Sequence, residues 1–168
     1  LSISLAGENS VSNTHTYADD LICAICVVGN LSIDGSGMLT VDAGNRGRGI
    51  YCTSGTIKNG TVSATGGQGV QCNDLSVENG ILTATGIADN SSGAGIEADG
   101  DVTIPGGTVT AAGTDPNHFS YGIRCGGNVR VEGGTVHATS AYGNGIEFNT
   151  NVTISGGNVT ATGGEYDS

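Results

Sequence analysis

Aromatic and polar side chains gather in the segments that join similar stretches of this sequence. Residues 86–94 and 113–121 are long joining segments, and residues 141–144 form one of intermediate length. They concentrate rings in a chain that is only 4% aromatic. Rings can stack on the faces of sugars, while neighbouring polar groups bind their hydroxyls. The sequence thus predicts a carbohydrate-binding surface that contains Asp89, Asn90, Asp115, His118, Phe119, Tyr121, Tyr142 and Arg124.

Phe119 also has a purely structural interpretation, because its ring could pin its joining segment to the repeat below. The sequence does not indicate catalytic chemistry. The sequence holds no Ser-His-Asp arrangement, phosphate-binding loop or His-x-x-x-His spacing, and Lys58 has no acid–base partner in the repeat register. We therefore expect a protein that is not an enzyme.

Oxygen-bearing side chains on one face of an expected strand form a second candidate site. Side chains one repeat apart are near enough to share a cation, and calcium takes six to eight oxygen ligands. The alternative is an acidic face that is simply solvated. Under the first interpretation calcium is the expected cofactor, and its ligands are Asn73, Asp74, Glu97 and Asp99.

An internal repeat determines where these residues lie. Within each copy, apolar residues fall at every second position in three short runs, and Asn-rich or Gly-Gly corners separate the runs. A period of two predicts strands. A repeat of about 20 to 50 residues predicts a solenoid, whose turns bury a shared core. The copies begin at Ala24, Gly49, Gly69, Gly95, Gly122 and Gly145.

The aligned copies predict an all-β fold, a right-handed single-stranded parallel β-helix with three short strands per rung, where a rung is one turn of the solenoid. We expect about six to seven rungs, spaced by roughly 4.8 Å. Residues 1–11 supply most of a first rung, with Leu1 and Ile3 inward. The expected inward columns run from Ile25 to Ile146, from Val27 to Phe148, from Ile33 to Ile154, from Leu39 to Val159 and from Val41 to Ala161.

Charge and composition narrow the functions. The 168 residues carry five Lys and Arg against 16 Asp and Glu, a net charge of −11. Nucleic acids and anionic membranes require a basic surface, so neither is an expected partner. A polyanionic ligand is disfavoured as well, unless a bound cation bridges it to the protein. No Pro-Gly-Ser run divides the chain, so residues 1–168 are expected to form one domain.

The sequence begins inside a strand pattern and carries no targeting signal or transmembrane run. We therefore expect a segment of a longer protein. Its acidic, Lys-poor surface, rich in Thr and Asn, favours a secreted or cell-surface origin.

The five cysteines are an odd number, and the register places Cys23, Cys52, Cys72 and Cys125 inward and Cys26 outward. Alternation puts Cys23 and Cys26 on opposite faces, so we do not expect a metal or redox site there. Buried free Cys packs as a small hydrophobic residue, which predicts a column of free thiols. A disulfide between Cys52 and Cys72, in adjacent rungs, is the alternative.

The outward face of the third strand carries a Thr-x-Thr array that resembles the ice-binding surface of solenoid antifreeze proteins. Asp42, Ala112 and His137 interrupt the array. Thr is also favoured at exposed strand positions because it is β-branched, which explains the array without any ligand. Ice binding is therefore an alternative function.

The consensus GGTVTATGG, preceded by G-I-x-C and a V-T-I strand, resembles the repeats of the pectate-lyase-like right-handed β-helix superfamily. It is most similar to the carbohydrate-binding β-helix domains of surface proteins from Gram-positive, clostridia-like bacteria. The resemblance covers nearly the whole chain. It implies a secreted or cell-surface bacterial adhesion module that binds polysaccharide, acidic sugars included, with support from calcium.

Lyases of this architecture use clustered acids for calcium and an Arg or Lys as base. Arg124, beside Glu97 and Asp99, is the one position that could imitate them. In the expected register Glu97 and Glu147 flank Arg124, in ion pairs that contribute about 0–1 kcal/mol each. Arg130 is the one other basic residue suited to a substrate carboxylate. The resemblance therefore implies binding without catalysis, with a passive stalk and a polysaccharide lyase as alternatives.

Overall fold

The computed structural model describes residues 1–13, 22–87 and 92–165, and every named element in these ranges is a β-strand. The strands form two sheets in which strands of successive repeats pair in parallel. The larger sheet has eleven strands: β1 (Ser2–Leu5), β3 (Cys23–Gly35), β5 (Arg48–Ile57), β7 (Gln68–Cys72), β8 (Asp74–Val77), β10 (Gly93–Ala98), β11 (Val102–Ile104), β13 (Ser120–Cys125), β14 (Val129–Val131), β16 (Ile146–Phe148) and β17 (Val152–Ile154). The smaller sheet has seven: β2 (Glu8–Ser12), β4 (Met38–Asp42), β6 (Thr61–Gly66), β9 (Ile81–Gly86), β12 (Thr108–Gly113), β15 (Thr135–Ser140) and β18 (Asn158–Thr162).

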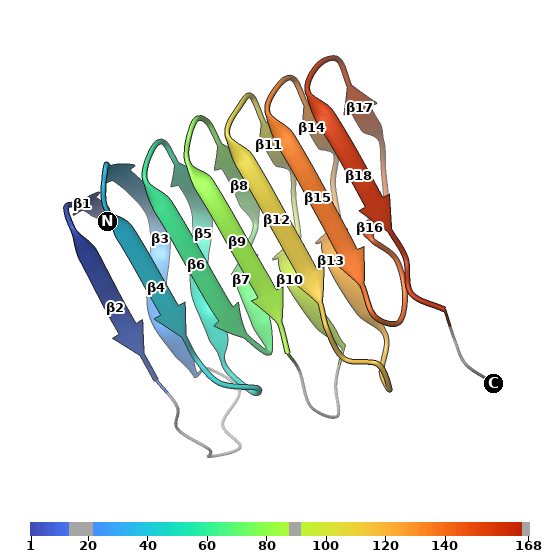
Figure 1. The fold of residues 1–168 in the computed structure, drawn as a ribbon, viewed down its shortest axis with the longest axis horizontal. Coiled ribbons are helices and arrows are strands. Elements are labelled where there is room, and N and C mark those ends of the chain that lie inside the picture. The colour runs from blue at the N-terminus through green and yellow to red at the C-terminus, as the bar shows by residue number, and fades with distance from the viewer. Residues whose placement is uncertain (14–21, 88–91, 166–168) are drawn as a thin grey trace.

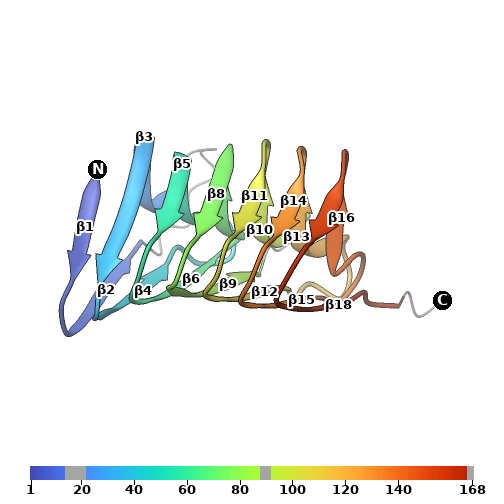
Figure 2. The same ribbon diagram turned by 90° about the horizontal axis from the view of Figure 1, so that it is seen from above.

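Successive strands are turns of one coil. Strands β7, β8 and β9 make one rung, and β10, β11 and β12 make the next. Figure 1 shows the smaller sheet as a row ordered from blue β2 to red β18, and Figure 2 shows the larger sheet from above as the remaining wall of the coil. In two rungs the first two strands are continuous, as β3 and β5. The predicted right-handed parallel β-helix is confirmed, with β1 and β2 as a partial first rung.

The strand register confirms the predicted inward columns. In the first column Ile50 pairs with Val70, Val70 with Ile96, and Ile96 with Ile123. The last column has the smallest side chains, and four of its alanines have no exposed surface. Their stacking leaves room for little more than a methyl group at this corner of the interior. They are Ala64, Ala84, Ala111 and Ala138.

Four apolar residues expected in the core are exposed instead. Leu1 is 67% exposed, Phe148 45% and Ile154 54%, and Ala161 on β18 is exposed as well. Phe148 still pairs with Cys125, and Ile154 with Val131, so their columns are correct. These residues lie on the first and last rungs, and no described strand covers their outer sides. Burial in a solenoid needs a neighbouring rung on both sides, so the expectation of burial is wrong for these four.

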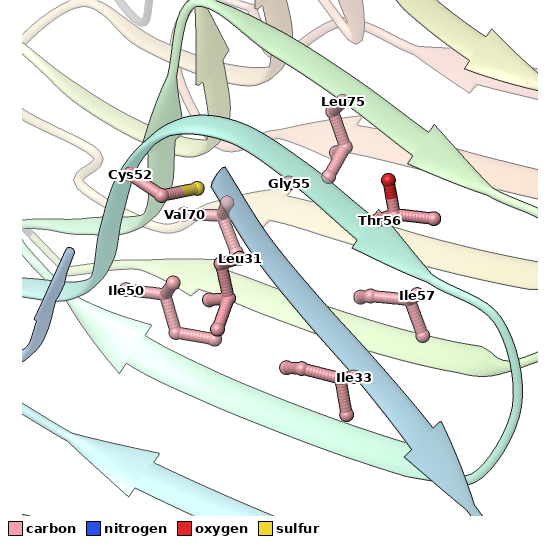
Figure 3. Close-up of a pocket in the computed structure, with 9 residues that line it drawn as sticks. All are labelled: Leu31, Ile33, Ile50, Cys52, Gly55, Thr56, Ile57, Val70 and Leu75. Atoms are coloured by element: carbon pink, nitrogen blue, oxygen red, sulfur yellow. The ribbon is translucent and has the colours of Figure 1, made fainter. Parts of the chain in front are cut away.

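A sixth inward column, which alignment of the repeats missed, lies on the larger sheet. Leu31 pairs with Gly55, and Gly55 with Leu75. Because Gly55 has no side chain, a small apolar cavity lies beside it, and Cys52 contributes to its wall (Figure 3). Glycine also interrupts the hydrophobic pattern, which hid the column in the sequence. Its members are Leu31, Gly55, Leu75, Val102, Val129 and Val152.

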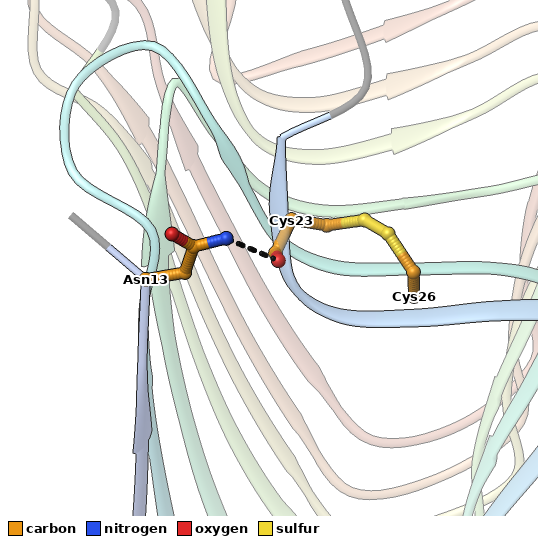
Figure 4. The surroundings of a disulfide bond; sticks show 3 residues. All are labelled: Asn13, Cys23 and Cys26. Carbon is orange, nitrogen blue, oxygen red and sulfur yellow. Dashed lines mark hydrogen bonds between the residues drawn. A yellow bond between two sulfur atoms is a disulfide. The ribbon is translucent and has the colours of Figure 1, made fainter. Parts of the chain in front are cut away.

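Cys23 and Cys26 lie on the predicted faces but are bonded to each other. Cys23 is buried and Cys26 is exposed, and the disulfide joins Cα atoms 5.6 Å apart (Figure 4). Residues three apart in an extended strand are separated by about 10 Å, so the chain bends here. The side-chain amide of Asn13 donates to the Cys23 carbonyl oxygen at 3.1 Å. The expectation of unbonded thiols is therefore wrong for this pair.

The other three cysteines match the predicted thiol column. Cys52, Cys72 and Cys125 are free, and each has at most 2% of its surface exposed. The alternative disulfide between Cys52 and Cys72 is not formed. These thiols pack as small apolar side chains in the core.

Candidate functional site

The corner where β12 and β15 pass into the next rung carries a pair of stacked rings. Phe119 lies in the segment between β12 and β13, and Tyr142 lies in the segment between β15 and β16. Their ring centroids are 4.8 Å apart and their planes differ by 21°. Phe119 remains 57% exposed. The two joining segments thus meet through an aromatic contact that presents a ring to solvent.

Asp115 fixes the shape of the segment that carries Phe119. Its Oδ1 accepts the backbone N–H groups of Asn117 at 2.8 Å and His118 at 3.2 Å. Its Oδ2 lies 2.9 Å from His118 Nδ1. Burial raises the pKa of Asp115, but these hydrogen bonds outweigh burial and hold the pKa below its usual value. Because the Asp115 side chain is only 7% exposed and that of His118 is 44% exposed, the imidazole is the group that solvent meets.

Two buried hydroxyls join this segment to the next rung. Ser120 Oγ lies 2.9 Å from Ser140 Oγ, and Ser140 Oγ donates to the Ser120 carbonyl oxygen at 2.6 Å. Ser120 Oγ also accepts the Tyr142 N–H at 3.2 Å and donates to the Asp115 carbonyl oxygen at 3.2 Å. Sequence reasoning missed these residues. The available signal was a serine at each position where the preceding rung has glycine, Gly93 and Gly113.

Arg124 is the centre of a charged group on the outer face of β13. Its Nη1 lies 3.2 Å from Glu97 Oε1, and its Nε lies 3.5 Å from Glu147 Oε1. The guanidinium carbon is also 5.4 Å from the centre of the Tyr121 ring, within the range of a cation–π contact. The predicted ladder of ion pairs is therefore confirmed, since Glu97, Arg124 and Glu147 stack in register on three rungs.

A polar hollow lies next to Arg124 on the same face. We call it the Arg124 hollow. Asp99 on its rim is exposed, and no hydrogen bond or ion pair of its carboxylate occurs among the described residues. Gly126 is required by close packing, because a Cβ there would collide with the Asp99 carbonyl oxygen. The hollow is lined by Glu97, Ala98, Asp99, Arg124, Cys125, Gly126 and Asn149.

Comparison with known proteins agrees with this architecture. A family described as β-helix repeat matches residues 102–123 and 152–167. The chain carries β-helix repeats. No curated protein and no solved structure matches this chain. Within the described ranges, no helix has the length and apolar character needed to cross a lipid bilayer.

The four predicted calcium ligands of the β-helix do not converge. Asp74 Oδ1 accepts the Asp101 N–H at 2.9 Å, and Glu97 is engaged by Arg124. In the described part of the chain, no three or more His, Cys, Asp or Glu side chains form a group that could hold a metal ion. Asp74 thus belongs to a corner hydrogen bond, and Glu97 and Asp99 line the Arg124 hollow. Asn73 lies outside the hollow, and its carbonyl oxygen accepts the Gly100 N–H at 2.7 Å.

For the remaining predicted features, the structure concerns position and not function. Asp89 and Asn90 lie outside the described residues. The Thr-x-Thr array of the β-helix is in register on the smaller sheet, where Thr83 pairs with Ser63 and with Thr110. The functions assigned to these residues stay predictions.

Proposed function

We propose that the β-helix is a non-catalytic, extracellular module that binds polysaccharide. The binding surface consists of the stacked Phe119 and Tyr142 rings, the Tyr121–Arg124 pair and the Arg124 hollow. Rings suit the apolar faces of sugars, and the carboxylates and amides of the hollow suit their hydroxyls.

The observation that carries this proposal is the exposed ring of Phe119. Stacking on Tyr142 covers one face of the Phe119 ring and leaves the other available to a ligand. Phe119 is 57% exposed although it stacks on Tyr142. Hydrogen bonds of Asp115, Ser120 and Ser140 hold the backbone on which the two rings stand. Such preorganisation lowers the entropic cost of binding.

Binding without catalysis is supported by the ion pairs of two arginine side chains. Arg124 is paired with two carboxylates, and Arg130 Nη1 lies 3.6 Å from Glu132 Oε1. Both guanidinium groups are therefore engaged with carboxylates of the protein and are not free for a substrate. An assay for unsaturated uronate products, read by ultraviolet absorbance, tests this point, and product formation would contradict it.

An extracellular location is supported by the disulfide between Cys23 and Cys26, because disulfides persist mainly in oxidising compartments. The acidic composition is compatible with the same proposal.

The decisive experiment is a polysaccharide-binding screen with wild type and Phe119→Ala. We expect binding by the wild type and at least about a fivefold weaker affinity for Phe119→Ala, because a well-packed aromatic contact contributes about 1 kcal/mol or more. Ile81→Ala is the matched control, since Ile81 is 46% exposed but lies beside Thr108 at the start of β12, whereas the aromatic corner follows the end of β12. Equal losses in both variants would contradict the proposed surface. Failure of every polysaccharide to bind would favour a passive stalk.

Calcium dependence is tested in the same screen. Each binding measurement is repeated with added calcium and with EDTA. Affinity that falls in EDTA would support calcium as a cofactor, and unchanged affinity would leave the aromatic and polar contacts as the whole site.

A further inference from the structure

The Arg124 hollow has an excess of negative charge although it contains an arginine. Glu97 and Asp99 line it, and Glu147 pairs with Arg124 from the next rung. Three carboxylates therefore surround one guanidinium. Like charges within a few ångströms repel each other, and salt screens exposed charges only partly at such distances.

The positive charge of Arg124 is already compensated. Glu97 and Glu147 lie on the two rungs that flank the rung of Arg124. Their Oε1 atoms are 3.2 Å from Arg124 Nη1 and 3.5 Å from Arg124 Nε, and the Tyr121 ring lies beside the guanidinium. A carboxylate on a sugar would have to displace one of these partners. It would also approach a group of three carboxylates and one guanidinium, which has a net excess of negative charge. An acidic sugar is thus a poor ligand for this hollow.

Asp99 favours a positively charged ligand instead. Its carboxylate is exposed on the rim, and among the described residues it has no hydrogen bond or ion pair. Asn149 lines the same hollow and offers an amide oxygen. An ammonium group is a donor of three hydrogen bonds and no acceptor, so it suits both partners.

We propose that the Arg124 hollow selects polysaccharides by charge and binds a sugar unit with a free amino group, as in a de-N-acetylated amino sugar. Uronic acids are rejected by the same carboxylates. This inference rests on the proposed function and specifies the class of ligand. It differs from the acidic sugars that the sequence resemblance implies.

The test compares three oligosaccharides of equal length in EDTA: glucosamine, N-acetylglucosamine and galacturonate oligomers. Binding is measured by calorimetry at low and at physiological ionic strength. We expect the glucosamine oligomer to bind most tightly and the galacturonate oligomer most weakly. The preference should narrow as salt rises, because exposed charges are screened.

Two variants separate the hollow from the overall charge of the protein. Asp99→Asn should weaken the glucosamine oligomer by up to about fivefold, the range of one exposed ion pair. It should leave the N-acetylglucosamine oligomer within about twofold. Glu132→Gln removes the same charge on the segment after β14, where Glu132 pairs with Arg130, and should change neither affinity.

Several outcomes would overturn the inference. These are tighter binding of galacturonate than of glucosamine in EDTA, equal effects of Asp99→Asn and Glu132→Gln, or no binding of the glucosamine oligomer. In each case, binding of any other polysaccharide that Phe119→Ala weakens would leave the proposed function intact. Binding of no polysaccharide at all would reject both.

Discussion

The hydroxyl oxygens of Ser120 and Ser140 lie 2.9 Å apart in the interior, where two successive rungs turn toward the aromatic corner. Ser120 has no exposed surface. Its Oγ accepts the Tyr142 N–H, so one side chain links the backbone on which Phe119 stands to the backbone of its stacking partner. A polar pair inside an apolar solenoid thereby positions an exposed surface.

Replacing Ser120 with Ala should destabilise the protein by about 1–3 kcal/mol, because the buried Ser140 hydroxyl and the Tyr142 N–H would each lose a partner. Urea denaturation measures the change. Ser76→Ala, on the partly exposed face of β8, should stay within about 0.5 kcal/mol. The hydroxyl pair has no structural role if the two variants are equally stable.

Gly55→Ala should stabilise the protein by about 0.4–1 kcal/mol, because it restricts the unfolded chain and partly fills the cavity of Figure 3. The new Cβ would lie 3.2 Å from Cys52 Sγ and from Leu75 Cδ1, both of which are ends of side chains that can shift. The denaturation midpoint is the measurement.

Gly69→Ala is the control for Gly55→Ala. There a Cβ would lie 2.6 Å from the Thr85 N atom and 2.7 Å from the Gly95 carbonyl oxygen. Backbone atoms in a ladder cannot move aside, so this variant should be clearly destabilised. A lower midpoint for Gly55→Ala as well would show that the cavity side chains cannot adapt.

Ala111→Leu should destabilise the protein by about 1–3 kcal/mol through overpacking. Ala111 has no exposed surface, and it stacks between Ala84 and Ala138. Thr110→Leu, the adjacent residue that points outward, is the control and should have a much smaller effect. Thermal melts followed by circular dichroism distinguish the two. Equal melting temperatures would mean that this corner is wider than the alanine column indicates.

Acid should destabilise the fold below about pH 4. Hydrogen bonds from Asn59 lower the pKa of Asp34, and those from Asn128 lower the pKa of Asp101. Asp115 has a lowered pKa as well. A lowered pKa in the folded state contributes stability above the unfolded pKa. That contribution is lost as pH falls through the folded value.

The measurement is the urea midpoint at a series of pH values. It should change little between about pH 7 and 5 and then fall below about pH 4. Asp101→Asn cannot titrate at this position, so its loss in acid should be shallower than that of Glu132→Gln. A midpoint that rises on acidification would show that repulsion within a chain of net charge −11 dominates instead.

The sequence was enough to predict most of the core but not the conformation of the corners. Alternation with a repeat aligned Ile96 with Ile123 and Glu97 with Arg124, because every strand residue has a fixed neighbour one rung away. The joining segments differ in length and have no such register. The stacking of Phe119 on Tyr142 and the burial of Asp115 therefore depend on loop conformations that periodicity does not specify.

Glycine and terminal position account for the errors in the core. Gly55 hid a whole column because it carries no hydrophobic signal. Phe148 was aligned correctly yet is exposed, because alignment gives the direction of a side chain and not the presence of a rung above it.

The three free thiols lie at different heights along the coil, with Cys52 and Cys72 in adjacent rungs and Cys125 further toward the last rung. A hydrogen bond with Cys52 and burial raise the pKa of the Cys72 thiol, which suppresses its reaction with alkylating reagents while the core is closed. The rate of alkylation at each cysteine therefore reports how often its own rung opens. Graded rates would reveal fraying from one end, and equal rates would reveal that the whole stack opens together.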